Sequence, residues 1–460
     1  MENTYISRKV REENAKFSRL NVIIIGGGLV GSLCACVFAK RGYKVTLYEK
    51  RPDPRKTTAC NGRSINLALS HRGRKTLRLV GLELSIMESS IAMKGRMIHP
   101  VAGETSSIPY DLVNNQCIYS VGRNFLNQIL LNAAEKHEGV TLVFKHKLSD
   151  VNFEENTLKL INQETKEIIT ETADLIIGAD GAFSCLRGFM QKRFLYDLTQ
   201  SYIEHGYMEL RVPASRGHKL RNNHLHIWPR GTFMMIALPN QDSSWTVTLF
   251  MPFKQFKSIT DPEKLLNFFS NTFTDALELI GKEELVQTFF TSNPAPLITV
   301  KCGQYHMGDR FLIIGDAAHA MVPFYGQGMN AGFEDCTILN NLLNEHKDNV
   351  KASIEAFSEQ RRQDVHAVCD LALYNYKEMR DLVTTRSFKF RKTLDGVLSK
   401  WLPEIWTPLY NSVSFSHMEY HKCLENKLWQ DKVLKRIFQM ISTILILVFA
   451  TIIYVFLSVK

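Results

Sequence analysis

A glycine-rich turn near the start of the chain constrains its fold more than any other feature. Gly26-Gly27-Gly28-Leu29-Val30-Gly31 follows the apolar run Asn21–Ile25 and precedes a helical stretch at Ser32–Arg41. The GxGxxG spacing provides a tight turn, a close approach of backbone to a pyrophosphate, and close helix–strand packing. The helix N-terminus then presents unpaired N–H groups and its positive dipole end to the phosphates. The pattern therefore predicts a dinucleotide-binding βαβ unit, with Gly26, Gly28 and Gly31 at the nucleotide.

A carboxylate at the end of the next strand narrows the choice of nucleotide. Glu49 closes the predicted strand Tyr43–Glu49, eighteen residues after Gly31, where a carboxylate can bind ribose hydroxyls. It would repel a 2′-phosphate, so the turn favours FAD or NAD over NADP. A glycine-rich turn that binds no nucleotide is the alternative.

Two later motifs point to a flavin. Gly178-Ala179-Asp180-Gly181 follows the predicted strand Asp174–Ile177, and Gly315-Asp316-Ala317-Ala318-His319 follows the predicted strand Phe311–Ile314. Asp316 at a strand end can accept hydrogen bonds from ribityl hydroxyls, and the helix N-terminus beside it can face a reduced isoalloxazine. Each motif alone could be a turn with a helix cap, but the three in this order indicate FAD.

The ordered trio resembles the group A flavoprotein aromatic hydroxylases, the p-hydroxybenzoate hydroxylase-like family, over residues 21 to about 345. The resemblance implies an α/β fold in which an antiparallel-sheet substrate domain is inserted into a Rossmann-like FAD-binding domain. It also implies noncovalently bound FAD and an NADPH that docks only transiently as reductant. The sequence agrees, because it contains no second GxGxxG.

The pattern of apolar, polar and turn residues along the chain predicts five segments. Helix at 123–137 and β-rich sequence at 139–169 fit a nucleotide-binding part, turn-separated apolar runs over Tyr202–Phe253 indicate an antiparallel sheet, and 351–435 is helical in pattern. The expected boundaries are FAD-binding domain, first part, 21–200; substrate domain 201–295; FAD-binding domain, second part, 296–345; helical region closing the substrate site 346–435; and membrane anchor 437–459.

Stretches between the motifs give a closer likeness. They resemble the branch of this family that hydroxylates L-kynurenine, and they are Gly62–Ser70, Arg96–His99, His205–Glu209, Ile227–Arg230 and Pro323–Asp335. The resemblance implies that NADPH reduces the flavin, O₂ adds at C4a, and the hydroperoxide hydroxylates L-kynurenine to 3-hydroxy-L-kynurenine in tryptophan catabolism. No catalytic group from the protein is implied, because the cofactor carries the hard chemistry.

The same resemblance assigns residues to substrate and cofactor. Arg96 would pair with the substrate carboxylate, Tyr110 would donate a hydrogen bond to it, and Asn375 and Tyr410 would complete recognition of the amino-acid end. The FAD contacts implied are Arg51, Arg123, Asp180, Asp316, Met329, Asn330 and the backbone near Val30, Ala68 and Leu148. The apolar wall around the ring is expected from Leu225, Ile227, Phe233, Met235, Phe324 and Tyr325. By residue type alone, a structural salt bridge for Arg96 and core packing for Tyr110 and Tyr410 remain open.

Other polar residues receive structural interpretations. His224 and His226 share a strand face but have no third ligand at suitable spacing, so we expect no metal site. Glu334 and Asp335 are expected to stabilise the dipole at the start of a helix over Gly332–Glu345. The nine cysteines are interpreted as packing residues.

The C-terminal segment predicts a membrane anchor. Ile437–Val459 contains no charged residue and as a helix reaches about 34 Å, enough for a hydrocarbon core of about 30 Å. Lys432, Lys435 and Arg436 precede it, which places the body of the protein on the cytosolic side. The resemblance adds the mitochondrial outer membrane, while a buried C-terminal helix is the alternative. The net charge of +10 fits an anionic ligand or a membrane, and no nucleic-acid module accompanies it.

Two rival functions remain at this point. One is a membrane-associated flavin monooxygenase of the same fold acting on another phenol or a lipid. The other is a non-catalytic relative that binds prenylated proteins, which would not need the Gly315–His319 flavin motif.

Overall fold

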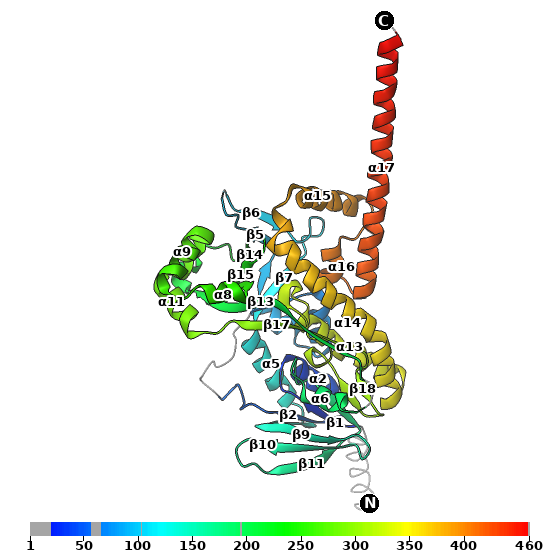
Figure 1. Ribbon diagram of the computed structural model, residues 1–460. Coiled ribbons are helices and arrows are strands. Elements are labelled where there is room, and N and C mark those ends of the chain that lie inside the picture. Colours follow the sequence, from blue (N-terminus) through cyan, green and yellow to red (C-terminus); the bar gives the residue numbers. More distant parts are fainter. Residues whose placement is uncertain (1–19, 57–65, 103, 194–195, 459–460) are drawn as a thin grey trace, which may run out of the picture.

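The glycine-rich turn lies at the centre of the fold. The computed structural model describes residues 20–56, 66–102, 104–193 and 196–458 (Figure 1). The turn joins strand β1 (Asn21–Ile25) to helix α2 (Leu29–Lys40), and strand β2 (Lys44–Glu49) follows, as predicted. A Cβ added at Gly31 would lie 1.9 Å from the carbonyl oxygen of Gly26, so only glycine permits this packing.

A six-stranded sheet, called here the parallel sheet, carries the three motifs in the order β18-β19-β12-β1-β2-β8. Its other strands are β8 (Val140–Phe144), β12 (Leu175–Gly178), β18 (His306–Met307) and β19 (Phe311–Ile313). All pairs are parallel except the β18–β19 pair. Helices α5 (Arg123–Glu135) and α13 (Gly328–Glu345) pack against α2. The predicted strands and the helix at 123–137 are therefore confirmed to within a few residues.

Two small sheets flank the parallel sheet. The β-rich stretch at 139–169 adds to β8 an antiparallel sheet of β9 (His146–Asn152), β10 (Thr157–Asn162) and β11 (Ile168–Thr172). The other small sheet and its neighbouring helices are β3 (Asn66–Leu69), β4 (Ile91–Met93), β7 (Ile118–Gly122), α3 (His71–Leu79), α4 (Glu83–Glu88) and α6 (Cys185–Gln191). Residues 57–65, which include the start of the Gly62–Ser70 stretch, lie outside the described residues.

A seven-stranded sheet, called here the large sheet, has the order β17-β13-β16-β15-β14-β5-β6. Its strands are β5 (Gly95–Ile98), β6 (Ser106–Pro109), β13 (Leu198–Val212), β14 (His224–Pro229), β15 (Met234–Pro239), β16 (Trp245–Pro252) and β17 (Ala295–Cys302). The antiparallel sheet predicted from Tyr202–Phe253 is confirmed. The sheet also recruits β5 from much earlier in the chain by parallel pairing with β14, which places Arg96 opposite Leu225. The segment predicted as the substrate domain, 201–295, therefore contains β14, β15, β16 and most of β13, but not β5, β6 or most of β17.

Helices cover one face of the large sheet. Its other face is directed toward the part of the molecule that contains the parallel sheet. The covering helices are α7 (Ala214–Gly217), α8 (Phe253–Ser258), α9 (Pro262–Thr272), α10 (Thr274–Ile280) and α11 (Lys282–Thr291). Trp228, Met235 and Trp245 from the sheet and Phe269 and Phe273 from these helices form one buried cluster. A strand alternates its side chains, so the residues between these point to the opposite face.

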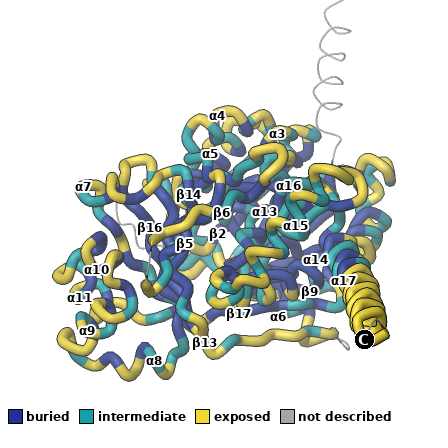
Figure 2. The backbone as a smooth tube through the Cα atoms, turned by 90° about the horizontal axis from the view of Figure 1, so that it is seen from above, coloured by how far each residue is buried: buried dark blue, intermediate teal, exposed yellow. Residues whose placement is uncertain are grey.

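The described chain after β19 is helical, which includes the segment 351–435 that was predicted to be so. Its elements are α12 (Asp316–His319), η1 (Pro323–Tyr325), α14 (Val350–Arg380), η2 (Leu382–Thr384), α15 (Arg386–Trp401), α16 (Leu409–Phe415) and α17 (Tyr420–Ser458). Helix α17 starts in the body, where Tyr420 and Leu434 are buried, and then extends away from it (Figures 1 and 2).

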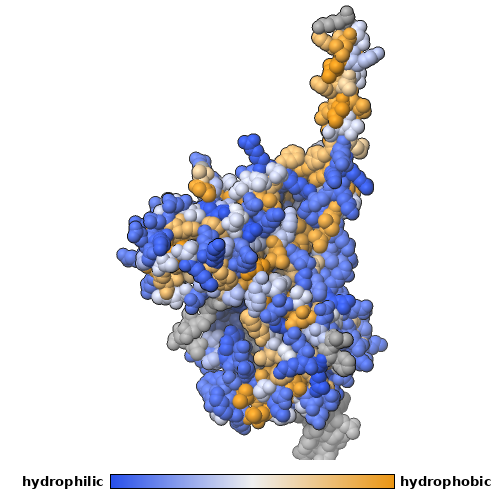
Figure 3. Space-filling view, in the orientation of Figure 1, coloured by the Kyte–Doolittle hydropathy of each residue, from blue (hydrophilic) through white to orange (hydrophobic). Residues whose placement is uncertain are grey.

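The outer part of α17 has the character of a membrane span. Every residue from Lys435 to Ser458 is exposed, and the helix is long and apolar enough to cross a membrane, with a mean hydropathy of 2.7 in its most apolar window. Figure 3 shows this apolar column standing free of the body. The alternative of a buried C-terminal helix is therefore wrong.

Candidate active site

One cavity joins the flavin motifs to the large sheet. It has a volume of about 840 Å³ and reaches from Gly28, Glu49 and Arg51 to Arg96 and Tyr410. This size is typical of a site that encloses an organic ligand. The predicted site residues that line it are Gly26, Gly28, Val30, Glu49, Arg51, Ala68, Arg96, Tyr110, Arg123, Leu148, Asp180, Asp316, Phe324, Tyr325, Met329, Asn375 and Tyr410.

At the nucleotide end, Glu49 holds the glycine turn. Its carboxylate accepts hydrogen bonds from the backbone N–H of Gly27 (2.8 Å) and from Nε of Arg51 (2.8 Å). Burial alone would raise the pKa of Glu49, but the hydrogen bonds and charge of Arg51 and the Gly27 N–H keep it below its ordinary value. A Cβ added at Gly28 would meet nothing within 4 Å, so backbone is open to the cavity there. This cradle fits a pyrophosphate.

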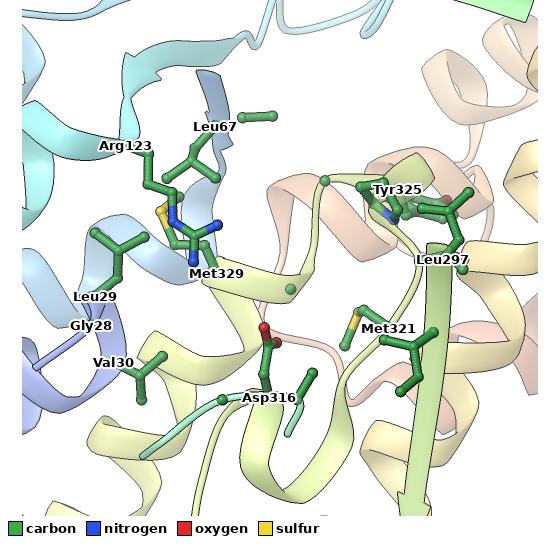
Figure 4. Close-up of a pocket in the computed structure, with 18 of the residues that line it drawn as sticks. Gly28, Leu29, Val30, Leu67, Arg123, Leu297, Asp316, Met321, Tyr325 and Met329 are labelled. Carbon is green, nitrogen blue, oxygen red and sulfur yellow. The ribbon is translucent and has the colours of Figure 1, made fainter. Parts of the chain in front are cut away.

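In the middle of the cavity, the side chains of Asp316 and Arg123 lie on opposite walls and both point into the cavity (Figure 4). Asp316 begins α12 and Arg123 begins α5. A carboxylate at a strand end and a cation beside the glycine turn suit the ribityl and phosphate groups of FAD, so the residues present fit that cofactor.

Two predicted cofactor residues have structural partners. Asp180 accepts hydrogen bonds from Oγ of Ser184 (2.5 Å) and the N–H of Cys185 (2.6 Å), so it caps α6 although it also lines the cavity. Asn330 donates to the carbonyl oxygens of Ala68 (2.8 Å) and Gly326 (2.7 Å), which ties the loop before α13 to β3. Asn330 and Gly31 do not line the cavity, but they support residues that do. Their contacts with FAD remain predictions.

At the other end, Arg96 lies on a platform of tyrosines. Its guanidinium carbon is 4.9 Å from the ring centre of Tyr410 and 5.9 Å from that of Tyr110. Tyr410 stacks on Tyr110 with ring centres 4.9 Å apart and on Tyr325 with centres 5.7 Å apart. Residues from β5, the segment after β6, η1 and α16 therefore meet here, as the resemblance implied.

The structure adds Glu378, which the sequence analysis missed. Its Oε1 accepts a hydrogen bond from Nη1 of Arg96 at 2.8 Å, and Asn375 Oδ1 lies 3.4 Å from Nη2. Burial would lower the pKa of Arg96, but Glu378 and the tyrosines hold it above its ordinary value. The signal available in the sequence was the spacing of Asn375 and Glu378, which puts both on one helix face.

Two buried donor groups at this end of the cavity lack hydrogen-bond partners of ordinary geometry in the described part of the chain. Nε of Arg96 and the hydroxyl of Tyr110 are buried, and neither makes a hydrogen bond of ordinary geometry with a described residue. Burial raises the pKa of Tyr110 well above its ordinary value, so its hydroxyl remains a neutral donor. Buried polar groups normally find partners, so an anionic ligand group is the expected complement.

The apolar wall differs from the prediction. Leu225, Ile236, Leu238 and Phe250 line the cavity together with Phe324 and Tyr325. Phe233 and Met235 do not, because they pack in the helix-covered cluster on the other face of the large sheet. Ile227 lies in the main core without reaching the cavity. The prediction chose the wrong face of β15, since a one-residue error in a strand reverses every side chain.

Glu334 and Asp335 do not stabilise a helix start. Helix α13 begins at Gly328, so both lie beyond its first turn. Glu334 pairs with Arg72 (2.8 Å), and Asp335 pairs with Arg361 (2.8 Å) and His319 (2.6 Å). Asp335 also accepts from the N–H of Gly315 at 2.8 Å, so this buried cluster fixes the loop that carries Asp316.

The histidines of β14 are engaged within the sheet. His226 contacts the carbonyl oxygen of Arg221 (3.0 Å) and His99 (2.8 Å), and His224 contacts Ser107 (2.8 Å). In the described part of the chain no group of three potential ligands surrounds a metal position. The eight described cysteines are free thiols.

Comparison with known proteins identifies the family. A family model described as an FAD binding domain matches residues 19–372. The chain is 56% identical over 420 residues to kynurenine 3-monooxygenase of Anopheles gambiae, covering 91% of this chain and 86% of that one. It is 44% identical to kynurenine 3-monooxygenase of Sus scrofa, covering 92% and 89% of the two chains.

Solved structures support the fold. The 2-methyl-3-hydroxypyridine-5-carboxylic acid oxygenase has a TM-score of 0.66 at 19% identity over 85% of this chain and 99% of that one. The pqsL protein of Pseudomonas aeruginosa, a probable FAD-dependent monooxygenase, has a TM-score of 0.64 at 15% identity over 81% and 99%. With the cavity and its cofactor cradle, these likenesses establish that the chain is an FAD-dependent enzyme and belongs to the FAD-binding monooxygenase family, in its kynurenine 3-monooxygenase group.

Proposed function

We propose that this protein hydroxylates L-kynurenine to 3-hydroxy-L-kynurenine, consuming NADPH and O₂. The names of its relatives support this substrate. The observation that carries the proposal is the buried Arg96, held by the partly buried Glu378, at the end of an aromatic cavity that continues to the FAD cradle. A phenol without an amino-acid chain would leave Nε of Arg96 and the hydroxyl of Tyr110 without a hydrogen-bond partner among the described residues.

Arg96 and Tyr110 suit the carboxylate of an amino acid. An arginine binds a carboxylate through two parallel N–H···O bonds, which fixes orientation as well as charge. Nε of Arg96 is available for this, and the Tyr110 hydroxyl adds a donor. Glu378, 2.8 Å from Arg96, holds the guanidinium in position for this contact.

The remaining wall holds the aromatic ring. Nδ2 of Asn375 donates to the carbonyl oxygen of Phe324 at 2.7 Å, which fixes η1 against α14. Phe324 packs edge-on against Phe250 of the large sheet with ring centres 4.8 Å apart. Together with Leu225 and Ile236, these residues place the ring and exclude water from the reaction.

The chemistry of oxygen comes from the cofactor. FAD held in this cradle would supply the redox chemistry, with electrons from NADPH and oxygen from O₂. The substrate's amino group, ortho to its acyl chain, makes the ring electron-rich at the position to be hydroxylated. Tyr110 and Tyr325, whose pKa values burial raises, remain protonated and act as orienting groups.

We also propose that α17 anchors the protein in the mitochondrial outer membrane with its body in the cytosol. The exposed apolar helix supports a tail anchor, and Lys432, Lys435 and Arg436 before it support the orientation. Fractionation of mitochondria from cells that express the full chain, followed by protease treatment, tests the location. Protection of the body from protease in intact mitochondria would refute it.

The product identifies the reaction. Mass spectrometry of the mixture formed from full-length protein, L-kynurenine, NADPH and O₂ should show a product one oxygen atom heavier than the substrate. NADPH oxidation should be stimulated by L-kynurenine and not by simple phenols. Equal stimulation by a phenol, or NADPH consumption without hydroxylated product, would favour another substrate.

A further inference from the structure

Helix α15 shows apolar side chains to solvent although it lies on the body of the protein. None of its sixteen residues is buried. Phe390, Val397 and Trp401 are 60%, 50% and 78% exposed. Their spacing of seven and four residues places them within about 40° of one another around the helix, so they form one narrow stripe. The opposite face of α15 contacts the body, but this stripe is left open to solvent, as the apolar face of a helix that binds a further surface is.

The stripe continues past the end of the helix. Leu402 and Ile405, in the turn after α15, are 44% and 57% exposed. Trp406, next to them, is buried and its indole N–H donates to Asp395 at 2.9 Å, so the turn is held in place. The exposed residues therefore belong to an ordered surface, which we call the α15 stripe: Phe390, Val397, Trp401, Leu402 and Ile405.

Direct contacts place the α15 stripe at the foot of the tail. Nη1 of Arg391 pairs with Asp431 of α17 at 2.7 Å, and the rings of Phe390 and Phe438 have centres 6.3 Å apart. Phe438 is the second residue of the uncharged segment that begins at Ile437. Helix α15 thus lies at the level where α17 changes from polar to apolar.

The direction of α15 matches a surface rather than a second span. In Figure 1 it runs across the axis of α17, at the end of the body from which α17 departs. Figure 2, viewed along the tail, shows α15 on the face of the body turned toward the viewer. If α17 crosses a bilayer along its axis, α15 lies in the plane of the headgroups.

The charges near the stripe complement anionic lipids. Arg386, Lys389 and Lys400 are exposed and lie along one edge of the stripe. Lys432 and Lys435 are exposed on α17 at the same end of the body. Basic residues beside an apolar stripe that contains Trp and Phe are typical of helices that lie in the interface of a membrane.

We propose that the α15 stripe is a second membrane contact, seated in the headgroup region of the bilayer that α17 crosses. This inference rests on the proposed tail anchor. A phospholipid surface fits better than a second copy of the chain, because the stripe is continuous with the foot of the tail and is bordered by basic residues. The contact fixes how the body sits on the membrane, which one helix alone would leave free to tilt.

The same helix touches the substrate side of the cavity. Nζ of Lys392 donates to the carbonyl oxygen of Tyr110 at 3.4 Å. A Cβ added at Gly396 would lie 2.6 Å from Leu112, so α15 packs tightly on the segment after Tyr110. Seating α15 in a membrane therefore steadies the segment that carries a wall residue of the active site.

Tryptophan fluorescence of the full-length holoenzyme tests the proposal. Of the five tryptophans, Trp228, Trp245 and Trp406 are buried, which leaves Trp401 and Trp429 to report on the surface. The protein is reconstituted in vesicles of phosphatidylcholine and phosphatidylserine whose acyl chains are brominated either near the headgroup or near their end. We expect strong quenching by the shallow bromine, weaker quenching by the deep one, and loss of most of this quenching in Trp401→Phe but not in Trp429→Phe.

A charge placed in the stripe provides a second measurement. Val397→Glu should reduce quenching of Trp401 by the shallow bromine while flavin absorbance and flotation with vesicles stay unchanged. Ile168→Glu is the matched control, because Ile168 is 59% exposed on β11, at the far end of the body. It should leave quenching at the wild-type level.

The outcomes separate the two proposals. The protein could float with the vesicles while brominated lipid leaves Trp401 unquenched and iodide, an aqueous quencher, reaches it. That result would refute the membrane contact of α15 and leave the tail anchor standing. Shielding of Trp401 that depends on protein concentration and not on bromine would assign the stripe to a second copy and overturn the inference. Failure to float would refute the tail anchor and this inference with it.

Discussion

Replacing Arg96 by alanine removes the guanidinium that lies over the tyrosine rings at the predicted substrate end. The guanidinium is 4.9 Å from the ring centre of Tyr410, and it neutralises Glu378 through a 2.8 Å hydrogen bond. The variant would therefore lose the partner of the substrate carboxylate. It would also leave a partly buried carboxylate that repels this same group.

The expected loss is large. Truncating one member of a buried, hydrogen-bonded charge pair costs about 2–5 kcal/mol, which corresponds to a Kd for L-kynurenine about 30- to 4,000-fold weaker. Part of this cost comes from the unpaired Glu378. We therefore expect Arg96→Ala combined with Glu378→Gln to bind L-kynurenine better than the sum of the two single effects predicts, as coupled neighbours do.

The assay is equilibrium titration of the flavin absorbance of the FAD-loaded variants with L-kynurenine. A decarboxylated analogue, which keeps the ring and the amino group, separates charge recognition from packing and should lose much less affinity in Arg96→Ala. Arg74→Ala is the matched control, because Arg74 pairs with Glu83 at 2.9 Å outside the cavity. An FAD-loaded Arg96→Ala protein with wild-type affinity for L-kynurenine would refute the reasoning.

Three further changes test the cofactor cradle, the buried cluster and the tail. Glu49→Gln should weaken FAD binding about 10- to 100-fold, because the glycine turn loses a charge-assisted hydrogen bond; FAD fluorescence on dilution measures this. Asp335→Asn should lower the free energy of unfolding by about 3–5 kcal/mol in urea, because Arg361 loses a buried carboxylate. Burial alone would raise the pKa of Asp335, but His319 and Arg361 lower it to about 2, so its contribution is present above about pH 4 and lost as pH falls toward 2. A chain that stops after Arg436 should leave the membrane fraction and keep FAD, since the buried part of α17 ends at Leu434.

Each of these predictions has its own control. Glu164→Gln, at an exposed glutamate, should leave FAD affinity unchanged, and equal Kd values for it and Glu49→Gln would contradict the role of Glu49. Acid unfolding of Asp335→Asn should be less steep than that of the wild type; identical pH profiles would exclude Asp335 as the titrating group. A chain stopped after Glu419 should lose FAD, because Tyr420 donates a hydrogen bond to Gln327 in the flavin loop at 3.1 Å.

The sequence was sufficient where the information is local. The turn after Asn21–Ile25 needs glycine because a Cβ at Gly31 would strike the Gly26 carbonyl oxygen, and that constraint is written in the GxGxxG spacing itself. The uncharged run from Ile437 likewise specifies an exposed helix by length and composition. Cofactor class and tail followed from such local patterns.

Errors arose where a face or a boundary had to be chosen. Phe233, just before β15, and Met235, within it, were placed on the cavity side of the large sheet. Strand periodicity gives two equivalent faces, and only packing against α9 and α10 selects between them. Glu334 and Asp335 were placed at a helix start because the Gly328–Asn330 stretch resembles a loop. In the structure this stretch is the first turn of α13, and Asn330 bonds from it to Ala68, far away in the chain.

The sequence by itself determined the cofactor and the tail, because each of the three flavin motifs and the apolar tail is a local pattern, and the order of the motifs can be read along the chain. Only the tertiary structure brought Glu378 to Arg96, which is 282 residues away in the chain, and aligned Tyr110, Tyr410 and Tyr325 into one stack. Long-range pairing of β5 with β14 makes this possible by drawing Arg96 into the large sheet. The proposed substrate recognition depends on side chains that are distant in the sequence and adjacent in the fold, and no local spacing predicts such contacts.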